Sequence, residues 1–169
     1  GRSGKMKWVP YTKQSYYHLG ERVFTGVILA SARYKGDINI AEGDTLIYNT
    51  PPRPFVSGVA LRAVSEHFNF KFIPPLEETE KMEFQERIAK GFDAAMIEGI
   101  DILGSLSVVL VKMGERFAEG AQTSKISMKM LHPKVIWRFL RGFIRSKMEK
   151  REMLPKDLWK VKGIPSGGM

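Results

Sequence analysis

Four short apolar runs alternate with longer segments of helical periodicity along this chain, and that alternation restricts the possible folds. The apolar runs are residues 46–49, 68–73, 94–97 and 159–164. The helical segments are residues 12–34, 59–68, 77–90, 106–117 and 133–151. No evident hairpin turn joins one run to the next, so helices must connect the strands. The pattern predicts an α/β protein with a mostly parallel sheet flanked by helices.

The four runs differ in the kind of strand that they predict. Residues 46–49 form a short apolar run bounded by turn-forming residues, as in a buried parallel strand. Residues 68–73 alternate strictly between apolar and polar side chains, which indicates a half-buried strand. We also expect strands at residues 94–97 and 159–164, the last of them followed by the sequence PSGG.

Composition places the chain among globular proteins, with 43% hydrophobic and 27% charged residues, and its 169 residues are most naturally one domain. The chain has no cysteine, which excludes disulfides, thiolate metal ligands and cysteine nucleophiles and fits a reducing cytoplasm. Three histidines, His18, His67 and His132, lack the spacing of zinc ligands. We therefore expect no zinc site.

The formal net charge of +9 belongs to one part of the chain. Residues 121–162 contain 12 lysines and arginines and three acidic residues, whereas the remainder contains 15 of each. The basic character is therefore a property of one segment rather than of the whole fold.

Residues 133–151, inside this basic segment, have the pattern of an amphipathic helix. Its apolar pairs recur every four residues: Val135-Ile136, Phe139-Leu140 and Phe143-Ile144. Its basic residues follow the same rhythm on another side: Lys134, Arg138, Arg141 and Arg145. We expect this helix to bury its apolar side and to expose its charges. Two alternatives stay open: a nucleic-acid interface in which Trp137, Phe139 and Trp159 stack on bases, and a helix that lies on a membrane surface.

Residues 1–12, GRSGKMKWVPYT, begin with two glycines, a serine, an arginine and two lysines within seven positions. A glycine-rich backbone with nearby lysines suits the binding of phosphate groups. The segment is not a Walker A loop, because Met6 follows Gly4-Lys5 where that loop has serine or threonine. A flexible basic chain end is the alternative interpretation.

The same segment resembles the phosphate loop of acyl-adenylate-forming ligases, which is rich in serine, threonine and glycine and ends in Gly-(Lys/Arg)-Pro-Lys. The match runs without a gap over residues 1–8, with Arg2 in place of a hydroxyl residue and Met6 in place of the usual proline. The phrases KWVPYT (7–12) and YNTPPRPFVSG (48–58), and the order of helices and strands, are similar to the auxin–amino acid synthetase-like and phenylacetate–coenzyme A ligase-like branches of that family.

This resemblance implies an enzyme that uses ATP and Mg²⁺ to convert a carboxylic acid to acyl-AMP and pyrophosphate. A thiol, such as that of coenzyme A, or an amine then accepts the acyl group. The implied ATP phosphate-binding residues are Gly1, Arg2, Ser3, Gly4, Lys5 and Lys7. The implied acyl pocket contains Phe55, Ser57 and Gly58, and the implied acyl-adenylate turn contains Gly167 and Gly168. On residue pattern alone, core packing explains Phe55 better than a pocket does, and a plain strand-to-loop turn explains the two glycines equally well.

The resemblance also implies a partial domain. It would comprise the phosphate loop at residues 1–12, strand–helix units at 13–120, and the basic helix with the Gly-Gly strand at 121–169. The family's aromatic-Gly-x-Thr-Glu segment, whose glutamate helps to hold the metal ion, would follow Met169. The ribose-binding aspartate and the C-terminal lysine of the family would lie further on. We therefore expect a piece of a longer cytoplasmic ligase that is inactive by itself.

Overall fold

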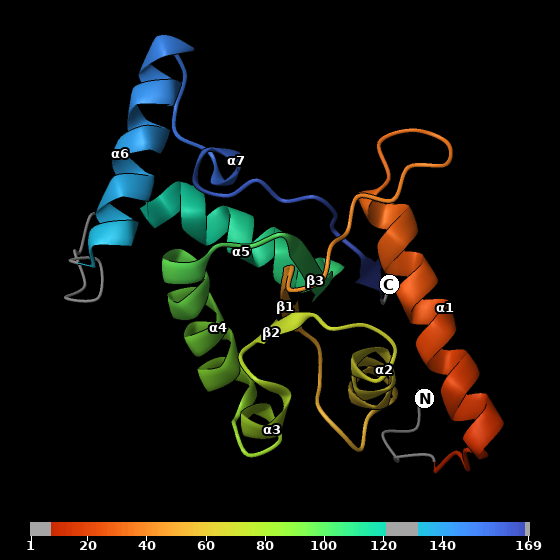
Figure 1. Cartoon of the computed structure of the whole chain (residues 1–169). Helices are drawn as coiled ribbons and strands as arrows, with labels where there is room; N and C mark the ends of the chain where they lie inside the picture. Colours follow the sequence, from red (N-terminus) through yellow and green to blue (C-terminus); the bar gives the residue numbers. More distant parts are fainter. Residues whose placement is uncertain (1–7, 121–131, 168–169) are drawn as a thin grey trace.

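The computed structural model describes residues 8–120 and 132–167, which form a parallel sheet with helices against both faces (Figure 1). The elements in chain order are α1 (Lys13–Ser31), β1 (Thr45–Asn49), α2 (Val56–Ser65), β2 (Lys71–Ile73), α3 (Leu76–Thr79), α4 (Phe84–Glu98), β3 (Ile102–Leu106), α5 (Ser107–Gly120), α6 (Pro133–Met148), α7 (Pro155–Leu158) and β4 (Ser166–Gly167). The sheet order is β2-β1-β3-β4, with every neighbouring pair parallel. The predicted α/β class is confirmed.

Strand β1 is a central strand of the sheet, between β2 and β3, and is buried along its whole length. Its side chains alternate between two hydrophobic clusters, as the pleat of a strand requires. Leu46 packs in a cluster with Val27 of α1 and Val64 of α2. Ile47 packs in the other cluster, with Ala95 of α4 and with Trp159. Helices α1 and α2 therefore cover one face of the sheet, and α4 covers the other.

The helix expected from residue 12 onward is α1, and its N-cap is Thr12. The Thr12 hydroxyl accepts a hydrogen bond from the backbone N–H of Ser15 at 3.1 Å. This bond satisfies one of the free N–H groups at the helix start. No helix in the described ranges, α1 included, is both long and apolar enough to cross a bilayer.

The strand predicted at residues 94–97 is wrong, because those residues are the last turns of α4. A four-residue apolar run looks the same in a strand and in a buried helix. In the structure Phe92 and Met96 continue one apolar stripe of the helix, and Ala95 is buried in the core. The helix ends at Gly99, whose φ of 105° suits glycine, and β3 begins three residues later.

The strand predicted at residues 159–164 is also wrong. Trp159 turns into the core, where its indole N–H donates to the carbonyl oxygen of Ala95 at 3.0 Å. Between residues 159 and 164, pairing with the sheet is limited to one bridge, from Gly163 to Ile102, and the two-residue β4 follows at Ser166. A Cβ at Gly163 would lie 2.8 Å from the carbonyl oxygen of Ala30, so this segment passes tightly beside the end of α1.

Strand β2 is shorter than the alternating run that predicted it and covers only Lys71–Ile73. The residues before it belong to an aromatic cluster. The ring centroids of Phe68 and Phe70 lie 4.6 Å apart, and Phe24 of α1 lies 5.0 Å from Phe68. This packing joins the start of β2 to the helical layer of α1.

Helix α6 forms as predicted, but it buries only part of the predicted apolar side, namely Val135 and, in part, Phe139. The residues that it buries are Val135, Gly142 and Ser146. Much of the expected apolar stripe, including Leu140 and Phe143, is exposed. The reason is the close approach of α7, because a Cβ at Gly142 would lie 3.3 Å from the carbonyl oxygen of Asp157.

Candidate functional site

The topology brings the carboxyl ends of β1 and β3 together at a point where the strand order reverses. The chain leaves β1 through α2 to reach β2 on one side, and it reaches β3 on the other side through α4. Helices α2 and α4 lie on opposite faces of the sheet. In open α/β sheets, ligands bind at the carboxyl ends of strands beside such a reversal. This edge is therefore the candidate site.

The turn between β1 and α2 is held rigidly at this edge. The Ser57 hydroxyl donates to the carbonyl oxygen of Pro51 at 2.8 Å, and the Phe55 N–H donates to the carbonyl oxygen of Pro52 at 3.1 Å. A Cβ at Gly58 would lie 2.2 Å from the backbone of Pro52, so any larger residue would force the turn away from α2. Ser57 and Gly58 thus fix the backbone conformation of the turn.

Phe55 takes a different position from its two predicted neighbours. It is the N-cap residue of α2 and gives the helix no side-chain cap. Its side chain is exposed, with a relative accessible surface of 48%, so core packing does not account for it. Phe55 therefore presents an apolar ring where the chain leaves the central strand.

Ion pairs connect this turn and α2 to α3. Arg53 Nε donates to Glu80 Oε1 at 2.6 Å, and Arg62 on α2 contacts Glu77 at 2.7 Å. Both pairs are partly exposed, so each adds little stability by itself. Together they connect α3 both to the proline-rich turn and to the helix that follows it.

Polar side chains cross the carboxyl edge of the sheet in register. Asn49 of β1 is aligned with Ser105 of β3, and Ser105 is aligned with Ser166 of β4. Registered residues of parallel strands point to the same face, so these three side chains form a row on the face that α4 covers. Asn49 and Ser105 are buried, whereas Ser166 is exposed. Sequence reasoning missed this row, because it placed the third strand at residues 94–97.

Arg87 is a buried cation in the first turn of α4. Helix α4 leads directly into β3, so its first turn lies toward the carboxyl edge of the sheet. Arg87 is 1% exposed, and none of its guanidinium nitrogens has a hydrogen-bond partner in residues 8–120 and 132–167. Its guanidinium carbon lies 5.3 Å from the centre of the Phe84 ring. Burial lowers the pKa of Arg87, because the charged form loses hydration.

Tyr48, the residue before Asn49, lies within the electrostatic reach of Arg87. The Tyr48 hydroxyl donates to Thr79 Oγ1 at 2.8 Å, and Thr79 donates in turn to the carbonyl oxygen of Leu76. Burial raises the pKa of Tyr48 to about 12, so its phenol stays protonated at neutral pH. Tyr48 therefore does not neutralise Arg87, and a carboxylate or phosphate would.

The predicted phosphate-loop residues Gly1, Arg2, Ser3, Gly4, Lys5 and Lys7 lie outside the described residues, as does Gly168. Gly167 lies in β4, where it is aligned with Leu106 at the end of β3. The predicted acyl pocket thus follows the carboxyl end of β1, and Gly167 lies beside the carboxyl end of the neighbouring strand β3. Within the described ranges, no group of three His, Asp or Glu side chains could hold a metal ion.

Two of the three aromatic residues expected to stack on bases in the nucleic-acid alternative are not exposed. Trp159 is buried, with its indole N–H bonded inside the core, and Phe139 is half-buried against the same cluster. Neither ring is available to stack on a base, which leaves only Trp137 exposed. Comparisons with protein-family models, with curated proteins and with solved structures found no match for this chain.

Proposed function

We propose that this chain is part of an ATP-dependent ligase that converts a carboxylic acid to an acyl-adenylate and passes the acyl group to a thiol or an amine. The observation that supports this function most is the position of the turn at Phe55, Ser57 and Gly58. These residues carry the sequence resemblance, and they follow the central strand at the point where the strand order reverses. That is the expected place for a ligand in a sheet of this kind.

The turn suits the apolar part of an acyl substrate. Phe55 offers an exposed ring, and Gly58 and Ser57 fix the backbone that carries it. A rigid turn holds an apolar surface in place without the entropic cost of ordering a loop when substrate binds. In the proposed enzyme, Phe55 contacts the acyl group, while Ser57 and Gly58 position Phe55.

The electrostatics of the same edge suit the anionic end of the reactants. The carboxylate and the phosphates carry negative charge, and Arg87 supplies a buried positive charge near β1. The start of α2 adds the partial positive charge of a helix N-terminus, which Phe55 does not cap with its side chain. Lys5 and Lys7 and the backbone N–H groups of residues 1–7 are proposed to neutralise the ATP phosphates.

The acyl-pocket assignment is tested by Phe55→Ala in the longer ligase of which this chain is proposed to be a part. Removing a large apolar contact should raise the KM for the carboxylic acid by roughly tenfold and leave the KM for ATP unchanged. Tyr34→Ala is the matched control, since Tyr34 is also an exposed aromatic residue but follows α1. An unchanged KM for the acid in Phe55→Ala would remove this turn from the pocket.

A second test reads the DNA on both sides of the coding segment. The proposal expects the reading frame to continue beyond Met169 into an aromatic-Gly-x-Thr-Glu sequence. It also expects two hydroxyl residues directly before Gly1. A frame that lacks both features would contradict membership of the ligase family.

A further inference from the structure

The outward side of α6 is apolar. The residues that α6 buries against the protein are Val135, Gly142 and Ser146. Because a helix turns by ~100° per residue, Trp137, Leu140, Ile144 and Met148 lie on the opposite side, and Ile136 and Phe143 lie on one flank of it. Each of these apolar side chains is at least 47% exposed. A monomeric protein rarely exposes so many large apolar side chains together without a binding role.

Contacts on the buried side hold α6 in this orientation. The backbone of α6 at Gly142 lies close to Asp157 of α7. Arg138 extends from α6 and donates to the carbonyl oxygen of Leu158 at 3.5 Å and to that of Ile97 at 3.4 Å. A rotation of α6 that buried its apolar side would break both hydrogen bonds and separate the helix from α7.

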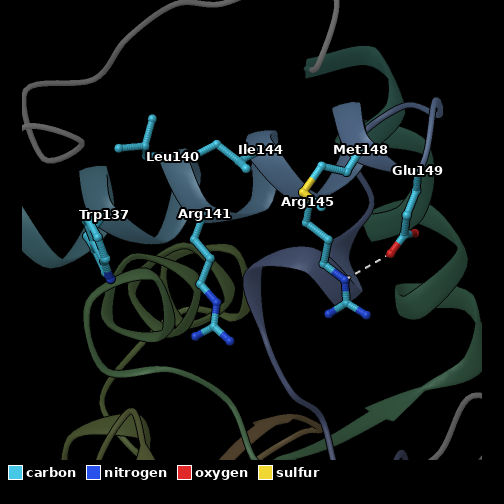
Figure 2. A pocket seen from close by; sticks show the side chains of 7 residues that line it. All are labelled: Trp137, Leu140, Arg141, Ile144, Arg145, Met148 and Glu149. Carbon is cyan, nitrogen blue, oxygen red and sulfur yellow. Dashed lines mark hydrogen bonds and ion pairs between the residues drawn. The ribbon is translucent and has the colours of Figure 1, made fainter.

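Basic side chains lie along one border of the exposed apolar side, and Lys147 lies within it, 5.5 Å from the centre of the Phe143 ring. Seven residues line a hollow of about 480 Å³ along the helix: Trp137, Leu140, Arg141, Ile144, Arg145, Met148 and Glu149. Figure 2 shows the aliphatic members along one side of the helix and the two guanidinium groups extending from the other. Arg145 pairs with Glu149 at 3.1 Å. Residues 133–151 contain seven lysines and arginines in all, against this single glutamate.

We propose that α6 docks the protein on an anionic membrane surface. The helix would lie in the plane of the interface, with Leu140 and Ile144 in the acyl-chain boundary and Trp137 at the headgroup level. Lys134 and Arg141 would contact the anionic headgroups from one border of the helix. This docking does not depend on the ligase function and is testable on the 169-residue chain.

Charge favours a lipid surface over a second copy of this chain or a nucleic acid. A second copy of this chain would bring a like charge of +9 toward the basic border of α6, and the two would repel. A nucleic acid would bind the basic border, but it would leave the apolar side chains of Leu140, Ile144 and Met148 exposed. An anionic bilayer matches both the charge and the apolar centre.

The test uses flotation with two kinds of vesicle, one of phosphatidylcholine and one of phosphatidylcholine mixed with phosphatidylserine. We expect the chain to bind the mixed vesicles and not the neutral ones. In a Trp8→Phe background, Trp137 is the exposed tryptophan and Trp159 is buried, so a blue shift of emission on binding reports insertion of Trp137. Lys134→Gln with Arg141→Gln should weaken binding roughly 30-fold, at about fivefold per charge.

The double variant Leu140→Glu and Ile144→Glu should abolish binding, whereas Leu29→Glu, at an exposed leucine of α1, should bind like the wild type. Far-UV circular dichroism checks that each variant is folded, which we expect because all three positions are exposed. Three results would overturn the proposal: no binding of the wild type to mixed vesicles, equal binding of the Glu double variant, or a dimer in sedimentation that the same double variant dissolves. The last result would assign the apolar side to a second copy.

Discussion

At the scale of single residues, the candidate site depends on one glycine and one arginine. Gly58 decides whether the proline-rich turn can lie against α2, since a Cβ there would overlap the backbone of Pro52 and Arg53. Arg87 places a positive charge inside the protein near the end of the central strand. A substitution at each residue should change the stability of the isolated chain in a way that can be measured.

Gly58→Ala should destabilise the protein by about 3 kcal/mol, because the new methyl group cannot fit without moving the turn. Gly26→Ala is the matched control, since nothing lies within 4 Å of a Cβ at that position of α1. The control should stabilise the protein by about 0.5–1 kcal/mol through better helix propensity. Urea unfolding of both variants measures the difference. Equal stability of Gly58→Ala and the wild type would show that the turn has another conformation.

Arg87→Met should leave the free energy of unfolding unchanged or raise it by about 1–3 kcal/mol. A buried guanidinium without a hydrogen-bonded anion is costly, and methionine fills a similar volume without that cost. The lost contact with the Phe84 ring offsets about 0.5–1 kcal/mol of the gain. A loss of more than about 2 kcal/mol would mean that Arg87 has an anionic partner after all. In the proposed ligase the same change should lower the rate of adenylate formation.

At the scale of the elements, the sequence predicts those with a strong repeat and succeeds for only some of the short ones. Thr12 and the apolar repeat after it locate α1, and the apolar run at residues 46–49 locates β1. The run at residues 94–97 misleads, because a helix and a strand can bury the same four apolar residues. The exposed side of α6 could not be predicted either, since it follows from the approach of α7 to Gly142.

The sequence likewise predicts the local part of the candidate site but not the parts that depend on tertiary packing. The family resemblance singled out Phe55, Ser57 and Gly58, and the proline-rich local sequence predicted a turn there; their role as an acyl pocket stays a prediction. The alignment of Asn49 with Ser105 needs the register of two strands that lie 56 residues apart in sequence. Arg87 has no local signal, since its burial comes from packing between α4 and the sheet.

The attachment of α7 should weaken in acid. Asp157 accepts hydrogen bonds from Arg151 at 2.6 and 2.7 Å and from the Leu154 N–H at 2.8 Å. The Arg151 guanidinium and this backbone bond hold the pKa of Asp157 well below its usual range, despite burial. A depressed carboxylate pKa gives stability that is present at neutral pH and is lost as the pH falls below about 4.

Asp157→Asn removes the titrating group and keeps its size. Urea unfolding of the wild type should show a marked fall in stability as the pH falls below about 4, and the variant should show a flatter dependence. The variant should also be less stable than the wild type at neutral pH. Parallel pH profiles for the two proteins would show that Asp157 does not supply the acid sensitivity.

At the scale of the whole molecule, charge and topology divide the chain into two candidate regions. The carboxyl edge of the sheet holds the candidate ligand site, beside β1, β3 and β4. The excess positive charge lies at residues 121–162 and includes α6. The proposed ligase chemistry belongs to the first region and the proposed membrane contact to the second, so each can fail without the other.

The isolated chain should not form acyl-adenylate. Under the proposed function, the glutamate that helps to hold Mg²⁺, the ribose-binding aspartate and the C-terminal lysine are supplied by the rest of the ligase. Each such group is worth about 2–4 kcal/mol of barrier, so their loss should lower the rate by roughly 10⁴-fold or more. Incubation with ATP, Mg²⁺ and a panel of aryl and fatty acids, followed by a hydroxamate trap, measures the product. Acyl-hydroxamate well above the no-enzyme control would show that these residues hold a complete site.

ATP–pyrophosphate exchange in the longer ligase tests the proposed function more directly than any other measurement. We predict exchange that requires a carboxylic acid and that falls in Lys7→Ala and Gly4→Ala, because both changes alter the proposed phosphate loop. Phe55→Ala should change which acids support exchange, and the Tyr34→Ala control should not. Acid-independent exchange, no exchange with any aryl or fatty acid, or wild-type rates in both loop variants would contradict this assignment.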